Sequence, residues 1–158
     1  MTLYNKETFF SQDWKTFDQW KEWWKSLDTA TSIEEILNNV VDYPSIADLI
    51  LEYIDRHQEK LPIHEIALSV FHAGQLYAIG KDINRAVGQF QRSYDLYPLG
   101  VGKEYILATI AFLQGDKFTL DTIADETDPS VINRDVIQRL RSGYGKSYVE
   151  AYSDINEV

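Results

Sequence analysis

The sequence contains no cysteine among its 158 residues and only one methionine. Without cysteine, the chain has no disulfide framework, no thiolate ligand for a metal and no thiol nucleophile. It also lacks a run of about 18 apolar residues, the length that a membrane-spanning helix needs. Its first residues lack the basic and apolar regions of a signal peptide. These absences predict a cytoplasmic protein that does not associate with a membrane.

Basic residues are scarce relative to acidic ones. The chain has 25 Asp and Glu residues against 15 Lys and Arg, a formal net charge of −10. Such a chain should repel nucleic acid, and we expect its partner to be a basic protein. Residues 28–59 hold eight carboxylates and one arginine, and a second acidic concentration falls at 116–128. Because 44% of the residues are hydrophobic, we expect one folded domain over 1–158.

Hydrophobic periodicity predicts helices throughout, and no segment alternates apolar and polar residues as a half-exposed strand would. The predicted fold class is all-α, with about eight helices. Asp82, Asp116 and Asp128 stand where N-caps are expected. Residues 143–158 should form either a short helix or a flexible tail. From residue 44 onward, the predicted helices are 44–58, 62–80, 82–97, 101–114, 117–126 and 129–142.

Residues 1–31 are rich in tryptophan and predict an N-terminal helix. Trp20, Trp23 and Trp24 share one apolar helix face. Either this helix packs on the open end of the helical stack, or its aromatic surface recognises a partner, since tryptophan is enriched at binding hot spots. The shared apolar face favours the first interpretation. A capping box, Ser-Ile-Glu-Glu at 32–35, predicts the start of a further short helix.

Small residues interrupt two otherwise regular helices in 67–100. Gly74, Ala86 and Ser93 lie at helix-interior positions, although glycine there costs about 1 kcal/mol relative to alanine. We expect Gly74 and Ala86 to let the two helices touch backbone to backbone. We expect Gly80, near the turn, to adopt a positive φ. The small residues therefore predict a packing role and not a chemical one.

Together with Tyr77, Phe90 and Pro98, these small residues have the spacing of a tetratricopeptide repeat, a helical hairpin of about 34 residues. Residues 67–100 resemble this family best, and 101–129 resemble it in a degenerate form. The resemblance implies a stack of antiparallel helical hairpins that binds a peptide or protein along its concave face. The positions that it assigns to this inner face are Leu68, Phe71, Gln75, Ala78 and Ile79.

No catalytic motif is present in the sequence. His64 and His72 are too far apart for the i, i+4 pair of a helical metal site. The sequence also lacks a nucleophile elbow, a phosphate loop and a dinucleotide-binding fingerprint. We therefore expect no enzymatic activity, no catalytic residue, no metal and no cofactor. A hydrolase that uses clustered carboxylates with a divalent metal is the alternative.

Two groups of carboxylates are candidates for binding a partner. The first group repeats at helical spacing and forms one narrow ridge, here called the acidic ridge: Asp48, Glu52, Asp55 and Glu59. The second group is the pair Asp121 and Asp125. Like charges at such spacing repel one another by a few tenths of a kcal/mol per pair. The ridge predicts either a site for a basic partner or an ordinary solvated face.

The predicted function is a non-enzymatic protein-binding module. In size, charge and fold type, the chain resembles the immunity proteins with which bacteria neutralise basic toxin domains, many of them nucleases. This resemblance implies an inhibitor that binds the toxin directly, with association accelerated by electrostatic steering. The alternative is a tetratricopeptide-like adaptor or scaffold that binds peptides in its groove.

Overall fold

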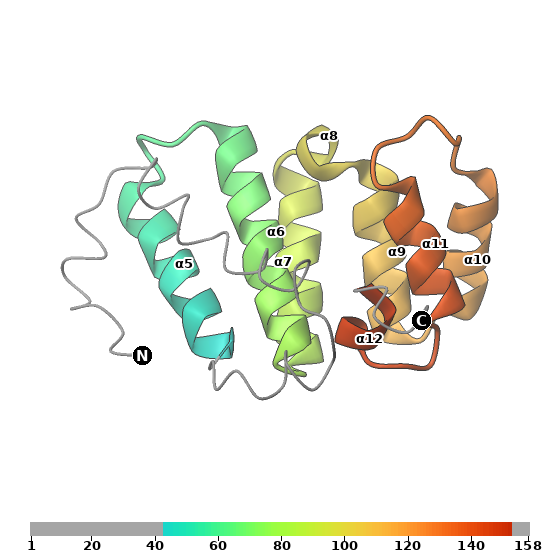
Figure 1. Cartoon of the computed structure of the whole chain (residues 1–158). Coiled ribbons are helices and arrows are strands. Elements are labelled where there is room, and N and C mark those ends of the chain that lie inside the picture. Colours follow the sequence, from blue (N-terminus) through green and yellow to red (C-terminus); the bar gives the residue numbers. More distant parts are fainter. Residues whose placement is uncertain (1–42, 153–158) are drawn as a thin grey trace.

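The structure, a computed structural model, describes residues 43–152 (Figure 1). Every regular element in this range is a helix, so the predicted all-α class is confirmed there. The predicted Trp-rich helix in 1–31, the capping box at 32–35 and the last residues, 153–158, lie outside the described range. The helices are α5 (Tyr43–His57), α6 (Ile63–Ile79), α7 (Ile83–Leu96), α8 (Pro98–Val101), α9 (Lys103–Gln114), α10 (Lys117–Glu126), α11 (Arg134–Ser142) and α12 (Tyr148–Tyr152).

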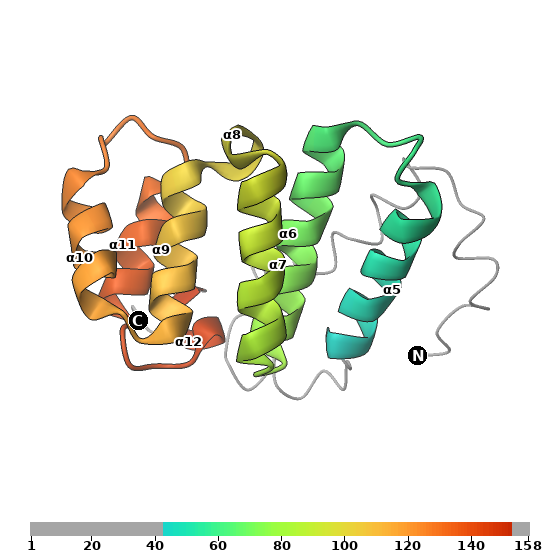
Figure 2. The same ribbon diagram turned by 180° about the vertical axis from the view of Figure 1, so that it is seen from behind.

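The long helices stand side by side in one row (Figures 1 and 2). Helix α5 forms one end of the row, α6 and α7 form its middle, and α9, α10 and α11 form the other end. The short α8 connects the upper ends of α7 and α9 in Figure 1. Helix α12 contacts both α6 and α11. No helix within the described part is long and apolar enough to cross a bilayer.

Two of the three predicted N-caps are present. Asp82 and Asp116 each accept a hydrogen bond from the backbone N–H three residues further on. Side-chain hydrogen bonds from Arg85 and Thr119, followed by these backbone bonds, lower the pKa of the two carboxyls. The prediction for Asp128 is wrong. Its carboxylate accepts hydrogen bonds from the backbone and hydroxyl of Ser130, a local turn that competes with helix formation. The predicted helix 129–142 therefore starts later, as α11.

Helix α6 lies at the centre of the core. Between 66 and 79, every residue except half-buried Leu68 is buried. Helices α5 and α7 pack against α6, and α8 and α12 also contact it. A helix enclosed in this way has little room for polar side chains, and its buried polar residues are Ser69, His72 and Gln75.

The small residues at the contact between α6 and α7 admit an aromatic ring. A Cβ on Gly74 would lie 2.8 Å from the ring of Phe90, and Ala86 on α7 is fully buried. The hydroxyl of Ser93 donates to the carbonyl of Ala67 over 2.8 Å, which joins the end of α7 to the start of α6. Gly74 thus permits close approach, but of a ring to a backbone and not, as predicted, of two backbones.

The expectation of a positive φ at Gly80 is wrong. Its φ is −74°, and a Cβ there would lie 2.5 Å from the ring of Pro44 on α5. Glycine is needed because another helix occupies the space, and not because the turn is left-handed. The left-handed residue is Lys81, with φ +64°. A non-glycine residue in this region is uncommon, so the turn holds a lysine where glycine would fit more easily.

The segment after Gly143 contains a short helix, which was one of the two predicted alternatives. A capping box starts α12: the Ser147 N–H donates to the Glu150 carboxylate over 2.9 Å, and the Glu150 N–H donates to the Ser147 hydroxyl over 3.3 Å. The hydrogen bonds from Ser147 lower the pKa of Glu150. Tyr148 and Tyr152 are buried against the rest of the molecule.

We predict that Gly74→Ala and Gly88→Ala have opposite effects on stability. Both remove a helix-interior glycine, which favours the helix by up to about 1 kcal/mol. Only the Gly74 variant pushes a methyl group into the Phe90 ring, because a Cβ on Gly88 meets nothing within 4 Å. Overpacking costs about 1–3 kcal/mol, so the two variants should differ by that amount in urea unfolding. Equal midpoints would contradict the packing described for Gly74.

We predict that Gly143→Ala detaches α12. The added Cβ would lie 2.6 Å from the Cβ and 2.7 Å from the Cα of Ala151, and backbone atoms cannot rotate away as a side chain can. Chymotrypsin should then cleave after Tyr148 and Tyr152, which are buried in the parent. Ser142→Ala, at an exposed neighbouring position, is the matched control. Equal cleavage of both variants would argue against the close contact.

Candidate functional site

Three residues of the acidic ridge lie on α5, and the fourth does not. Asp48 and Asp55 are exposed and Glu52 is half-buried, on the opposite side from the helix face that packs into the core. Helix α5 ends at His57, so the exposed Glu59 lies in the turn that follows. Helical spacing predicts four ridge residues on one helix. Helix α5 carries three of them, and Glu59 lies beyond its end.

Asp48 is held in place by residues from two other helices. The Tyr77 hydroxyl donates to its carboxylate, and the Arg85 guanidinium lies 3.0 Å from the same oxygen. Arg85 also pairs with Asp82 over 2.5 Å and lies 4.5 Å from the centroid of the Tyr77 ring. Burial and the hydrogen bond to Asp48 raise the pKa of Tyr77 to about 12. Asp48 therefore connects α5 to α6 and α7.

The remaining carboxylates near the end of α5 differ in their partners. Glu52 pairs with Arg56 over 2.8 Å along the same helix, a partly exposed contact worth about 0.3–0.5 kcal/mol. Asp55 and Glu59 have no ion-pair partner within 4 Å in the described part of the chain. Lys60, also exposed, follows Glu59 directly. Among residues 43–152, Asp55 and Glu59 are thus the carboxylates of the acidic ridge that have no cationic partner.

Asp121 and Asp125 lie on α10, at the far end of the row from α5 (Figures 1 and 2). Asp121 pairs with Lys117 of the same helix over 2.5 Å, and Asp125 pairs with Arg141 of α11 over 2.5 Å. The six candidate residues therefore do not form one surface. The pair on α10 is separate from the acidic ridge and already has cationic partners.

The two histidines of α6 lie in different environments. His64 is exposed near the Tyr97 ring, with ring centroids 6.4 Å apart. His72 is buried, edge-on to Phe71. Within residues 43–152, no three His, Asp or Glu side chains gather as metal ligands would.

Two of the inner-face positions implied by the repeat resemblance, Phe71 and Gln75, are covered by other parts of the chain. The Phe71 ring packs between those of Phe90 and Tyr105, with centroids 4.9 and 5.1 Å away. The Gln75 amide donates to the Tyr148 hydroxyl over 3.2 Å. Burial raises the pKa of both Tyr105 and Tyr148. Tyr105 of α9 and Tyr148 of α12 thus cover part of the face on which a tetratricopeptide protein would hold a peptide.

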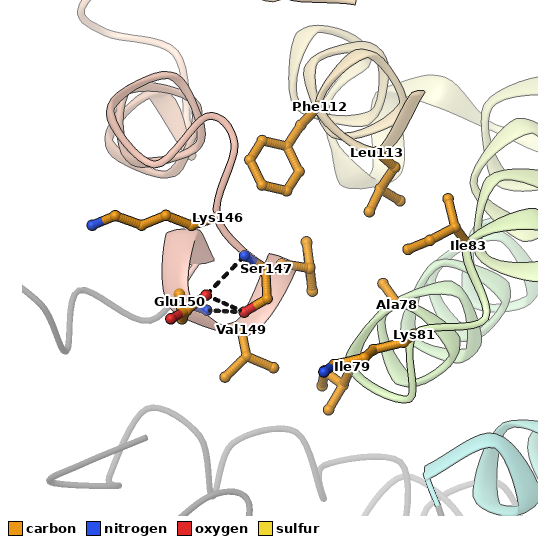
Figure 3. Close-up of a pocket in the computed structure, with 11 residues that line it drawn as sticks. Ala78, Ile79, Lys81, Ile83, Phe112, Leu113, Lys146, Ser147, Val149 and Glu150 are labelled. Atoms are coloured by element: carbon orange, nitrogen blue, oxygen red, sulfur yellow. Dashed lines mark hydrogen bonds between the residues drawn. The ribbon is translucent and has the colours of Figure 1, made fainter. Parts of the chain in front are cut away.

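A cavity of about 430 Å³ remains where this filling stops (Figure 3). It lies between the turn from α6 to α7, the end of α9 and the start of α12. Its charged lining residues are Lys81, Lys146 and Glu150. Its size falls within the range of small-ligand sites, about 300–1,000 Å³. Its apolar lining residues are Ala78, Ile79, Ile83, Phe112, Leu113 and Val149.

Sequence reasoning did not find this cavity. The sequence does contain one local signal at this place: Ser147 and Glu150 form a Ser-x-x-Glu capping box, which predicts the start of a helix but not the cavity beside it. A lysine directly after Gly80 gives no sign of its left-handed conformation. The walls come from three segments that only the tertiary structure brings together, so no spacing in the sequence predicts the space between them.

In comparisons with known proteins, no family model, no curated protein and no solved structure matches this chain. The resemblance to tetratricopeptide repeats rests on the residues quoted above.

We predict that Tyr77→Phe changes how stability depends on alkaline pH. Unfolded tyrosine loses its proton near pH 10.0, whereas folded Tyr77 keeps it until about pH 12. The free energy of unfolding should therefore fall between these values, because the unfolded state releases a proton that the folded state retains. The fall should be smaller in Tyr77→Phe. Unfolding midpoints at pH 9 to 12, read with the tyrosinate absorbance, would test this; identical pH profiles would contradict it.

Proposed function

We propose that this chain is a non-enzymatic protein-binding module that takes a basic protein partner at the C-terminal end of α5. One observation carries the proposal. Asp55 and Glu59 are exposed and have no cation within ion-pair distance among residues 43–152, on a chain whose formal net charge is −10. A basic surface brought there would supply the missing counter-charges.

The electrostatics support fast association more than tight binding. A net negative chain attracts a basic partner over distances set by the Debye length, about 30 Å at low salt and about 8 Å at physiological salt. Such steering can raise the association rate by tenfold or more. Asp48 and Glu52 contribute less to this in the proposal, because Arg85 and Arg56 already compensate them.

The proposed architecture is a cytoplasmic stack of antiparallel, tetratricopeptide-like helical hairpins. The contacts of Gly74 with Phe90, and of Ser93 with Ala67, support this for α6 and α7. They lie at positions where the repeat places its small and aromatic residues.

An inhibitor of a basic toxin domain is the specific form that we favour. An adaptor would need an open inner face, and here Phe71 and Gln75 on that face are covered by Tyr105 and Tyr148. An inhibitor can instead use an outer surface, such as the exposed end of α5. The coverage of these two positions therefore supports the inhibitor over the adaptor.

We predict that Asp55→Asn with Glu59→Gln weakens partner capture, whereas Asp121→Asn with Asp125→Gln does not. Both double variants remove two negative charges, but the second pair lies at the other end of the molecule and already has cationic partners. Each variant and the parent would be immobilised and exposed to a bacterial lysate at low salt. The parent and the Asp121/Asp125 double variant (the α10 variant) should retain the same basic proteins from the lysate. The Asp55/Glu59 double variant (the α5 variant) should retain less of them.

Association kinetics of the captured protein then test the mechanism. The α5 variant should bind more slowly than the parent, with a flatter dependence on salt. Lys60→Gln removes a positive charge beside Glu59 and should have the opposite effect on the association rate. If all variants capture the same proteins at equal rates, the end of α5 is an ordinary solvated surface.

A further inference from the structure

The cavity in Figure 3 is lined mainly by apolar side chains, and its two lysines, Lys81 and Lys146, are exposed; the edge of the cavity at these lysines is here called the mouth. Ala78 and Ile79 from α6, Phe112 and Leu113 from α9, and Val149 from α12 face it from different sides. Three helices distant in sequence thus enclose one space. Such a combination of apolar walls and a few polar groups is typical of a small-molecule site.

The charges at the mouth favour an anion. Neither Lys81 nor Lys146 has an ion pair within 4 Å in the described part of the chain. Glu150 is the only acidic lining residue, and its carboxylate binds the N–H and hydroxyl of Ser147 as part of the α12 capping box. The lining therefore has a net charge of the opposite sign to that of the whole chain.

The backbone conformation of Lys81 adds a second observation. Lys81 is left-handed, with φ +64°, in a turn where glycine would be adopted at lower cost. The backbone bonds that end α6, among them the one from the Asp82 N–H to the Tyr77 carbonyl over 2.9 Å, require this conformation at residue 81, and it fixes where the lysine side chain leaves the backbone. In Figure 3 the Lys81 ammonium lies beside Ile79, whereas the Lys146 side chain points away from the other lining residues. Both side chains are flexible and exposed, so each ammonium can move to an anion at the mouth.

We propose that this cavity binds a small amphipathic carboxylate. Its apolar tail lies between α6, α9 and α12, and its carboxylate lies at the mouth with Lys81, with Lys146 as a second cation. The site is independent of the partner proposed for α5, because none of its lining residues belongs to that helix.

The two parts of such a ligand have separate energetic signatures. Each methylene that enters an apolar site should raise affinity about fourfold, until the tail fills the available space. The carboxylate should add a contribution that depends on the lysines and that weakens as salt screens it. A series of unbranched acids from butyrate to dodecanoate, and the alcohols of the same lengths, separates these two effects.

The experiment is a titration of the full chain, labelled with ¹⁵N, with each acid below its micelle concentration. Chemical shifts should move for the amides of Ala78, Leu113 and Val149, and affinity should rise with tail length and then level off. The matching alcohols should bind at least tenfold more weakly. If the shifts map elsewhere, if no acid binds, or if alcohol and acid bind equally, the proposal is wrong.

Variants then test the residues. Lys81→Gln with Lys146→Gln should weaken decanoate at least tenfold and leave decanol unchanged. Lys60→Gln with Lys103→Gln, at exposed positions away from the cavity lining, is the charge-matched control and should change neither affinity.

Filling the cavity provides an independent test. Leu113→Trp should abolish binding of acid and alcohol alike, while thermal melting confirms that the protein remains folded. If Leu113→Trp does not fold, Ile83→Trp serves as the second variant, because it fills the cavity from α7. Two outcomes would overturn the assignment. One is that decanoate still binds a folded variant whose cavity is filled by tryptophan, and the other is that the double lysine variant binds decanoate as tightly as the parent does.

Discussion

The enclosure of α6 by its neighbours constrains most of the structure. A buried helix has to accommodate adjacent helices at close range and satisfy its polar side chains within the protein. Gly74 meets the first requirement by admitting the Phe90 ring. Gln75 meets part of the second by donating to Tyr148, which fixes α12 against α6 although 73 residues separate the two side chains in sequence. Tyr148 and its neighbour Val149 then give the cavity one of its walls.

Those features of the fold that depend on local sequence were predictable. The helical class, the approximate bounds of α5, α7 and α10, and the caps at Asp82 and Asp116 follow from periodicity and from side-chain to backbone hydrogen bonds within a few residues. The errors have two causes, a tertiary contact at Gly80 and a competing local turn at Asp128. Gly80 is small because Pro44 of another helix packs on it, and nothing in the turn itself reveals this. Asp128 forms a turn with Ser130, a local alternative to capping that the same residue types allow.

The candidate site was predictable only in part, for a related reason. Helical spacing places Asp48, Glu52 and Asp55 on one exposed side, and the structure agrees. Spacing cannot show that Arg85, 37 residues away, compensates Asp48. It also cannot show a space between segments, such as the one beside Lys81. Charges read from a sequence are therefore an upper limit on the charge that a folded surface presents.

The way α12 is attached has a consequence for the order of folding. Helices α6 and α7 are joined by a short turn, so their contacts close a small loop at low entropic cost. Helix α12 has five residues, too few to be stable alone, and its bond to Gln75 closes a far longer loop. We therefore expect the α6–α7 pair to belong to the early-folding part of the chain and α12 to dock last. In the native state, α12 then belongs to the part that opens at the lowest free energy, and the wall it gives the cavity opens with it.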